Sequence, residues 1–236
     1  MTSKTVHVLS GGAAAAVVGG VQAQFEGASG ARIQGSFSAV GQMREQLLAG
    51  VPCDLVILTR PLIEQLIASG HVVAGSAASL GRVKTGVAVR AGEPHPKVGD
   101  REELGAALRA ARGIYFPDPA LATAGIHFMN VLKALGLDQA LQGQLRPYPN
   151  GATAMREMGR SQEPGLIGCT QVTEINYTPE VELVAPLPAE FELATDYTLG
   201  ICSQAAHPDL ASQLAGLLTG EASEAIRQRG GFEFEG

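Results

Sequence analysis

The chain has 236 residues, enough for one large domain or two modest ones with real cores. Hydrophobic residues make up 45% of it and charged residues 17%, proportions that exclude a disordered tail and a membrane protein. The formal net charge of −6 argues against a nucleic-acid surface, which would need a basic stripe. A small anion can still be bound, because local amide donors matter more than the distant total charge.

Strand-like and helix-like runs alternate along the chain. The first strands are predicted over 5–10, 31–36 and 53–59, and the first helices over 13–25, 39–50 and 61–70. The alternation continues through segments 82–90, 101–111, 113–118, 123–136, 144–149, 151–159, 165–170, 181–186 and 197–203, and a closing helix is predicted over 208–218. This alternation predicts an α/β fold with mainly parallel sheets. Because every connection is short, two domains would have to share strands and would not be joined by a flexible linker.

The three cysteines lie at unrelated spacings, at Cys53, Cys169 and Cys202. They form no CxxC or CxxxH pattern, so we expect no structural zinc site and interpret them as buried apolar residues. Cys169 lacks an identifiable histidine partner, which argues against a nucleophile. No metal or organic cofactor is implied.

The first residues imitate a secretory signal, with Lys4 before an apolar stretch and small residues up to Ala23. His7 and two Gly-Gly pairs interrupt the stretch, which is also too short to span a membrane. Cleavage there would remove the first predicted strand and helix. We therefore expect Met1 to lie close to the true start, no membrane insertion, and a cytoplasmic protein, or a periplasmic one if an export signal has been removed.

The order of these elements resembles the molybdate-type solute-binding proteins of ABC transporters. The resemblance covers almost the full length and rests on the order and spacing of VLSGGAAAAV, FSAVGQMREQLLAGVPCDLVILT, GHVVAG, DPALATAGIHFMNVLKALGL and NGATAMREM. It implies a type 2 periplasmic-binding-protein fold with two lobes, each a mixed, mainly parallel sheet flanked by helices, and a ligand cleft between them. The implied lobes are 1–84 with 199–236, and 85–198, joined by strands that cross near 82–88 and 193–200.

The resemblance also implies where an anion is held, namely by hydroxyls and backbone N–H groups at strand ends and helix starts. The implied ligand-binding residues are Ser10, Gly11, Gly12, Ser36, Ser38, Thr123, Ala124, Gly125, Asn150, Gly151 and Ala152. Each hydroxyl has a structural alternative, because serine and threonine are favoured as helix N-caps anyway. One of Ser36 and Ser38 is expected to cap the following helix, and Thr123 is predicted to be an N-cap that faces the cleft.

The sequence departs from the molybdate-type pattern after the segment 165–170. Relatives usually present a tyrosine there, whereas this chain has Gly168-Cys169-Thr170 followed by the run TQVTEI. Thr170 and Gln171 follow an apolar strand, and α/β proteins place ligands beyond the carboxyl ends of their strands. We therefore predict that both contact the ligand.

Thr59 and Arg60 stand at the end of another predicted strand and are also predicted to bind ligand. The guanidinium of Arg60 could hold a planar carboxylate through two parallel hydrogen bonds, which would favour an organic acid over a tetrahedral oxyanion. The alternative is a solvated arginine whose stem lies on the surface.

Two classes of function follow. The first is binding of a small anion, a carboxylate or an oxyanion, by a homologue of solute-binding proteins; without an export signal, an ABC transporter partner is doubtful. The second is an isomerase of an unsaturated di- or tricarboxylate, since aconitate isomerase belongs among the molybdate-type proteins. A sensor domain for a partner protein ranks last, because no output module is attached.

The isomerase hypothesis needs carboxylate clamps, a base that takes a proton, and a donor that returns it. His127 is predicted as the proton carrier, because the pKa of an unperturbed histidine lies near neutrality. Glu174 is a candidate general base. The alternatives are a histidine satisfied by the helix surface or core, and an acidic residue in a first helical turn.

Overall fold

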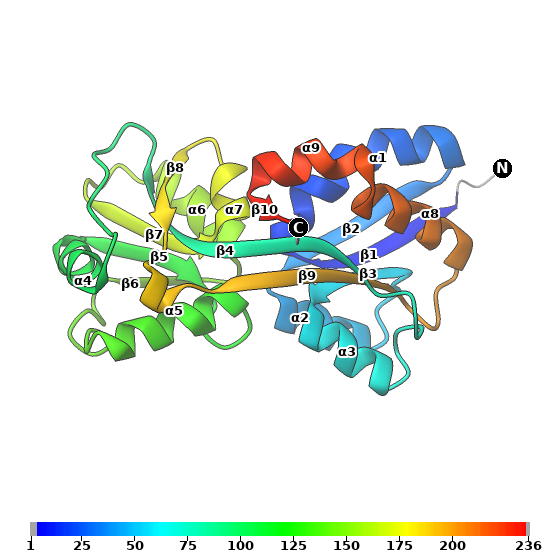
Figure 1. Ribbon diagram of the computed structural model, residues 1–236, viewed down its shortest axis with the longest axis horizontal. Helices are drawn as coiled ribbons and strands as arrows, with labels where there is room; N and C mark the ends of the chain where they lie inside the picture. Colours follow the sequence, from blue (N-terminus) through cyan, green and yellow to red (C-terminus); the bar gives the residue numbers. More distant parts are fainter. Residues whose placement is uncertain (1–3, 235–236) are drawn as a thin grey trace. The chain divides into compact units, whose positions relative to one another are not determined.

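The computed structural model describes residues 4–234 and has the predicted α/β periplasmic-binding-protein fold (Figure 1). Its contacts divide the chain into two compact units. One unit contains the described residues up to Arg82 together with those from Thr195 onward, and the other is Val83–Ala194. The lobe boundaries given above at 84/85 and 198/199 remain a prediction.

The first unit is built on a sheet of the order β2-β1-β3-β9. Its elements are β1 (Thr5–Gly11), the 3-10 turn η1 (Gly12–Ala14), α1 (Ala15–Ser29), β2 (Arg32–Ser38), α2 (Val40–Leu48), β3 (Leu55–Thr59), α3 (Arg60–Ala68), β9 (Ala194–Ile201), α8 (Pro208–Thr219), α9 (Glu221–Gly230) and β10 (Phe232–Glu233). Strand β1 is parallel to β2 and β3, and β9 is antiparallel to β3. Helices α1, α8 and α9 cover one face of this sheet, and α2 and α3 cover the other (Figure 1).

The second unit has a sheet of the order β4-β7-β5-β6. Its elements are β4 (Ala78–Arg90, which begins in the first unit), α4 (Arg101–Ala110), β5 (Gly113–Pro117), α5 (Thr123–Ala134), β6 (Leu145–Tyr148), α6 (Gly151–Arg160), β7 (Leu166–Gln171), α7 (Val172–Asn176), β8 (Val181–Pro186) and the 3-10 turn η2 (Ala189–Phe191). Strands β5, β6 and β7 are parallel, whereas β4 is antiparallel to β7 and β8.

Each face of the second sheet has its own core. Residues of α4 and α5, among them Leu104 and Phe128, pack with Phe116 on one face, where the Phe116 and Phe128 rings meet edge to face at 5.4 Å. Residues of α6, among them Met155 and Met158, form the core of the other face. Burying a side chain of this size contributes roughly 1.5–3 kcal/mol, so these two cores hold the strand ends in register.

Two local features differ from the sequence-based expectations. The strand predicted over 31–36 runs instead to Ser38, because Leu9–Gly11 of β1 pairs with Ser36–Ser38. Helix α7 was predicted only through the alternative given for Glu174, an acid in a first helical turn, which is confirmed; with five residues the helix is too short to show periodicity. Within residues 4–234, no helix combines the length and the apolar character that crossing a membrane requires.

Candidate functional site

Three parallel strands of the first unit end at the same edge of its sheet. Ser10 pairs with Phe37 of β2 and with Ile57 of β3, and Gly11 pairs with Ser38. The structure thus brings together Ser10, Gly11, Gly12, Ser38 and Thr59 beyond these strand ends. Ser36 lies opposite Leu9, farther back along an outer strand, and its side chain is exposed.

The hydroxyls at this edge are removed from bulk water. Ser10 is fully buried, and its Oγ donates to the carbonyl oxygen of Gly11 at 2.8 Å. Ser38 and Thr59 are also buried. A Cβ on Gly11 would come within 2.8 Å of Cγ1 of Val40 and 3.1 Å of the Tyr197 ring, so close packing requires glycine there.

The serines and Thr123 do not cap helices as expected. Ser36 and Ser38 both belong to β2, and the N-cap of α2 is Ala39. Thr123 is the first residue of α5, whose N-cap is Ala122. The expected capping roles are therefore wrong, since the strand continues through Ser38 and α5 starts one residue earlier than a Thr123 cap would require.

The helix starts beside these residues carry no side-chain cap. The N-cap residues Gly11, Ala39, Thr59 and Ala122 make no side-chain hydrogen bond to the first turns of η1, α2, α3 and α5. Free N–H groups at helix starts attract anions through their partial positive charge. The first-turn amides at these four starts are therefore suited to holding negatively charged oxygens.

Arg60 holds a carboxylate of the chain itself. Its Nε and Nη2 donate to Oδ2 of Asp196 at 2.9 Å and 2.6 Å. Ser79 and Thr198 donate to Oδ1 of the same carboxylate at 2.8 Å and 2.9 Å. Burial alone would raise the pKa of Asp196, but the hydrogen bonds from Arg60, Ser79 and Thr198 lower it overall. The guanidinium is thus engaged with a protein carboxylate, a geometry that does not favour the ligand clamp predicted for Arg60.

The parallel strands of the second unit also end together, and three helices start beyond them. Pro117 of β5 pairs with Tyr148 of β6, and Tyr115 pairs with Gly168 of β7. Helices α5, α6 and α7 begin just after these strands, so the predicted residues Thr123, Ala124, Gly125, Asn150, Gly151, Ala152, Thr170, Gln171 and Glu174 gather at one edge.

Glu174 is seated at the start of α6. Its Oε2 accepts a 2.5 Å hydrogen bond from Oγ1 of Thr170. The backbone N–H groups of Ala152 and Gln171 also bond to the carboxyl group. Burial raises the pKa of Glu174 overall, although these three hydrogen bonds each act to lower it. The chain thus places its own carboxyl group where a free helix start would attract an anion.

The segment Asn150–Ala152 is shaped around this carboxyl group. A Cβ on Gly151 would lie 1.9 Å from Oε2 of Glu174 and 2.0 Å from Oγ1 of Thr170, so only glycine fits. The side-chain oxygen of Asn150 accepts from the N–H of Thr153 at 2.8 Å and caps α6. These contacts give the segment a structural role. Its contacts with a ligand stay a prediction.

Gln171 and Thr85 carry buried polar atoms without a partner. Neither Nε2 nor Oε1 of Gln171 has a hydrogen-bond partner among the described residues, and Oγ1 of Thr85 likewise has none. The two residues lie directly opposite each other on β7 and β4. Buried polar groups are almost always paired in native proteins, so these atoms are candidates for binding a ligand group or an ordered water. Thr85 was not predicted from the sequence, although it is a lone hydroxyl in an otherwise apolar half-strand.

His127 has a structural partner. Its Nε2 lies 2.7 Å from the carbonyl oxygen of Phe191 and donates to it, because a carbonyl only accepts. The alternative of a satisfied helix histidine therefore explains its position. Two residues earlier, Gly125 lets α5 start against β5, since a Cβ there would lie 2.3 Å from the carbonyl oxygens of Pro117 and Asp118.

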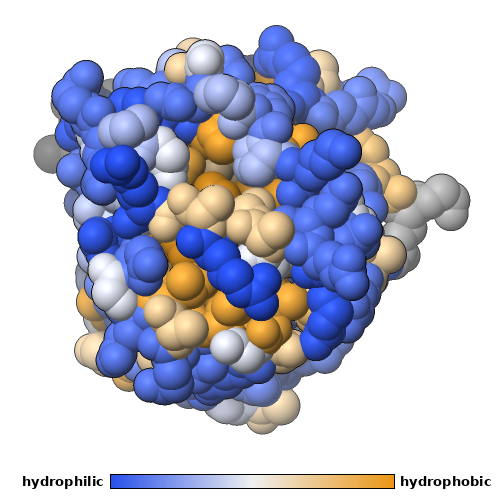
Figure 2. Space-filling view, turned by 90° about the vertical axis from the view of Figure 1, so that its left-hand side faces the viewer, coloured by the Kyte–Doolittle hydropathy of each residue, from blue (hydrophilic) through white to orange (hydrophobic). Residues whose placement is uncertain are grey.

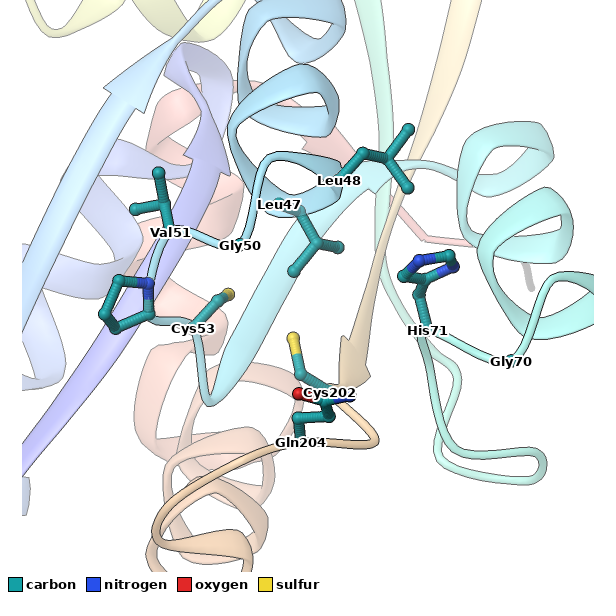
Figure 3. A pocket seen from close by; sticks show the side chains of 10 residues that line it. Leu47, Leu48, Gly50, Val51, Cys53, Gly70, His71, Cys202 and Gln204 are labelled. Atoms are coloured by element: carbon teal, nitrogen blue, oxygen red, sulfur yellow. The ribbon is translucent and has the colours of Figure 1, made fainter.

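Each unit also has a hollow that is lined by residues other than the strand-end residues described above. A hollow of about 420 Å³ in the first unit is lined by Leu47, Leu48, Gly50, Val51, Pro52, Cys53, Gly70, His71, Cys202 and Gln204 (Figure 3). Cys53 precedes β3, so this hollow lies at the amino end of that strand, and a hydrogen bond with Cys53 raises the pKa of Cys202. In the second unit, a mainly apolar hollow of about 260 Å³ involves Val89, Ala107 and Ile167.

Figure 2 shows one face of the molecule, where hydrophobic side chains gather near the centre and hydrophilic ones surround them. Neither this gathering nor the two hollows offers the convergent amides and hydroxyls of the strand ends. Among residues 4–234, no three His, Cys, Asp or Glu side chains come together in a way that could hold a metal ion.

Two α/β units whose helices start at the carboxyl ends of parallel strands fit the class of solute-binding proteins. The chain belongs to the family described as bacterial extracellular solute-binding protein, whose model matches residues 6–233. The resemblance to the molybdate-type proteins is confirmed.

Individual relatives agree with this assignment. Aconitate isomerase from Pseudomonas sp is 26% identical over 236 residues, which cover 96% of this chain and 87% of that protein. The periplasmic molybdate-binding protein of Azotobacter vinelandii superposes with a TM-score of 0.80 at 19% identity, covering 98% of this chain and 100% of that one. The sulfate-binding protein of Mycobacterium tuberculosis H37Rv gives 0.75 at 15% identity, covering 97% and 86%. At these identities the structural likenesses show the fold alone.

Proposed function

We propose that the protein binds a small organic anion that carries carboxylate groups, using the strand-end residues described above. In the first unit the binding groups are Ser10, Gly11, Gly12, Ser38 and Thr59, and in the second unit Thr123 with its following amides and Gln171. Thr170 is not among them, because its hydroxyl donates to Glu174. The observation that carries this proposal is the set of helix starts without a side-chain cap next to buried hydroxyls.

The physical argument is local. A helix start contributes about 0.3–1 kcal/mol of attraction for a nearby negative charge, and more when it is partly buried. Several such starts beside buried hydroxyls can offset the net charge of −6 carried by the whole chain. Aconitate isomerase as a relative favours a carboxylate, whereas the molybdate- and sulfate-binding structures share the fold and favour an oxyanion.

Calorimetric titration tests this proposal. The panel contains cis-aconitate, trans-aconitate, citrate and tricarballylate, with molybdate and sulfate as the tetrahedral alternatives. We expect at least one carboxylate to bind with a measurable dissociation constant. Ser10→Ala should weaken that binding, whereas Ser69→Ala, at the exposed end of α3, should leave it unchanged. Heat changes from molybdate or sulfate alone would contradict the carboxylate proposal.

Glu174 favours a second candidate function, an isomerase of an unsaturated di- or tricarboxylate. In such a reaction a C–H bond next to the double bond breaks, its electron pair forms a new double bond, and a proton is added at the far end of the three-carbon system. A buried carboxyl group with a raised pKa holds a proton more tightly than a free carboxyl group, which suits it to taking and returning one. Glu174 supports this role better than His127, whose Nε2–H is engaged by Phe191.

Deuterium exchange tests the catalytic candidate. Wild-type protein in deuterated buffer would place deuterium at the allylic position of aconitate or convert one isomer into the other. Glu174→Gln keeps hydrogen-bond acceptors for Thr170 and Ala152, so it should retain ligand binding and lose exchange. Binding without exchange by the wild-type protein would leave a non-catalytic binding protein. The expected cytoplasmic location is part of neither proposal and stays a prediction for cell fractionation.

A further inference from the structure

We infer that Gln171 selects a ligand group that offers a hydrogen-bond donor and an acceptor side by side. Such a group is a carboxyl that keeps its proton, or a hydroxyl next to a carboxylate. A fully ionised tetrahedral oxyanion such as molybdate or sulfate offers acceptors only. This inference rests on the proposed function and names the chemical class of ligand that the second unit takes.

The first argument is the state of the Gln171 amide. The residue is 2% exposed, and both Nε2 and Oε1 are buried without a hydrogen-bond partner among the described residues. Because both ends of the amide are unpaired, the conclusion does not depend on which end is assigned as oxygen. An amide presents one donor side and one acceptor side, so a single ligand group satisfies both sides when it offers both kinds of atom.

The second argument is that the neighbouring protein groups leave this amide to a ligand. Thr85 lies directly opposite on β4, and its own N–H and C=O bond to Leu193 and Leu187 on the other side of the strand. The side chains of such a pair stand close together. Even so, the Thr85 hydroxyl makes no bond to the Gln171 amide and is itself unpaired among residues 4–234.

The third argument concerns charge. Thr170 precedes Gln171 on β7, so its side chain points to the opposite face of the sheet, where it donates to Glu174. Glu174 in turn takes the N–H of Ala152 at the start of α6. The partial positive charge at the start of α6, which would attract a free oxyanion, thus already faces the carboxyl group of Glu174. The unpaired polar groups that remain at this position are both neutral: the amide of Gln171 on β7 and the hydroxyl of Thr85 on β4.

An ionised oxyanion would therefore satisfy Nε2 of Gln171 and leave Oε1 buried without a donor. A protonated carboxyl satisfies both amide atoms through two hydrogen bonds, and a hydroxyl beside a carboxylate does the same. The two sources differ in their dependence on pH. Affinity for tricarballylate, which has no hydroxyl, should rise as the pH falls from 8 to 6 if the protonated carboxyl is recognised. Affinity for citrate should exceed that for tricarballylate at pH 8 if the hydroxyl is recognised.

The test is Gln171→Met, which keeps the length of the side chain and removes both polar atoms. We expect affinity for the carboxylic acids to fall by roughly 10- to 100-fold, the loss of one or two hydrogen bonds. The melting temperature of the ligand-free protein should stay the same or rise, because an unpaired buried amide is removed. Gln65→Met, the same change on the exposed surface of α3, should alter neither quantity.

The outcomes separate the two proposals. Carboxylate binding by the wild-type protein with equal affinity in Gln171→Met would overturn this inference and leave the proposed function intact. Wild-type affinity for molybdate or sulfate that matches its affinity for the acids would also overturn it. A wild-type protein that binds no carboxylate overturns both. If Gln171→Met does not fold, Gln171→Asn, which withdraws the amide by one carbon, should give the same loss of affinity.

Discussion

At the scale of single residues, the unusual feature is a buried carboxyl group that forms no ion pair within residues 4–234. Glu174 is supported by a hydroxyl and two backbone N–H groups, and burial raises its pKa. The same site explains a glycine, because Gly151 faces the Glu174 carboxyl and the Thr170 hydroxyl. Neither relation was visible in the sequence, since both depend on contacts between α6, β7 and α7 that no local pattern encodes.

The raised pKa of Glu174 predicts how stability depends on pH. The folded protein keeps this proton more tightly than the unfolded chain, in which the pKa lies near its ordinary value of 4.5. The stabilisation is therefore fully present below that value and is lost as pH rises through the folded pKa. Glu174→Gln should flatten this loss as the pH rises above 4.5 in urea unfolding, and identical pH profiles of both proteins would contradict the raised pKa.

Gly151→Ala should destabilise the protein, because its methyl group would overlap the Glu174 carboxyl. We expect a loss of about 1–3 kcal/mol in the free energy of unfolding, the usual cost of overpacking. The control is Gly216→Ala in α8, where nothing lies within 4 Å of the new Cβ. That change should stabilise the protein by about 0.5–1 kcal/mol, since alanine is the better helix former. Equal effects of the two changes would refute the packing argument.

At the scale of helices and strands, periodicity predicted most of the architecture. The apolar strand around Leu55–Thr59 and the helix that starts at Arg60 followed from local composition and from proline at the second helical position. The candidate site was predictable as far as strand ends and helix starts, because these follow from the alternation of elements. The helix caps were not predictable, because β2 continues to Ser38 through its pairing with β1. This is a long-range effect that local residue preference does not show.

The capped start of α6 allows a prediction at this scale. Asn150→Ala removes the hydrogen bond to the Thr153 N–H and should cost about 1 kcal/mol of stability. Asp100→Ala removes the equivalent bond to the Glu103 N–H in α4 and should cost a similar amount. Only Asn150→Ala should also slow deuterium exchange into aconitate, because the start of α6 holds the carboxyl group of Glu174. Equal exchange rates of the two variants, measured by proton NMR, would contradict a role of α6 in the site.

At the scale of the whole molecule, each compact unit carries its own strand-end cluster, and the two differ in chemistry. The first unit offers buried hydroxyls and uncapped helix starts, and the second offers an amide and a protein carboxyl group. The family and fold were accessible from the order of segments along the chain. The pairing of Thr85 with Gln171 could not be predicted from the sequence, because it depends on the register between β4 and β7.

The net charge of −6 predicts an unusual response to salt. Added salt screens repulsion between the protein and an anionic ligand beyond a Debye length of about 10 Å at 0.1 M, and screens buried hydrogen bonds much less. Affinity for a tricarboxylate should therefore hold or rise between 50 and 300 mM potassium chloride. A fall of more than about 10-fold in calorimetric titrations would instead indicate attraction by exposed cationic side chains.

The binding of a small carboxylate is tested most directly by ligand-detected proton NMR of the wild-type protein. The sample contains cis-aconitate, trans-aconitate, citrate and tricarballylate at concentrations well above that of the protein. We expect the proton lines of at least one acid to broaden when the protein is added and to sharpen again when an excess of a second acid displaces it. Unchanged line widths for all four acids would contradict the proposed function.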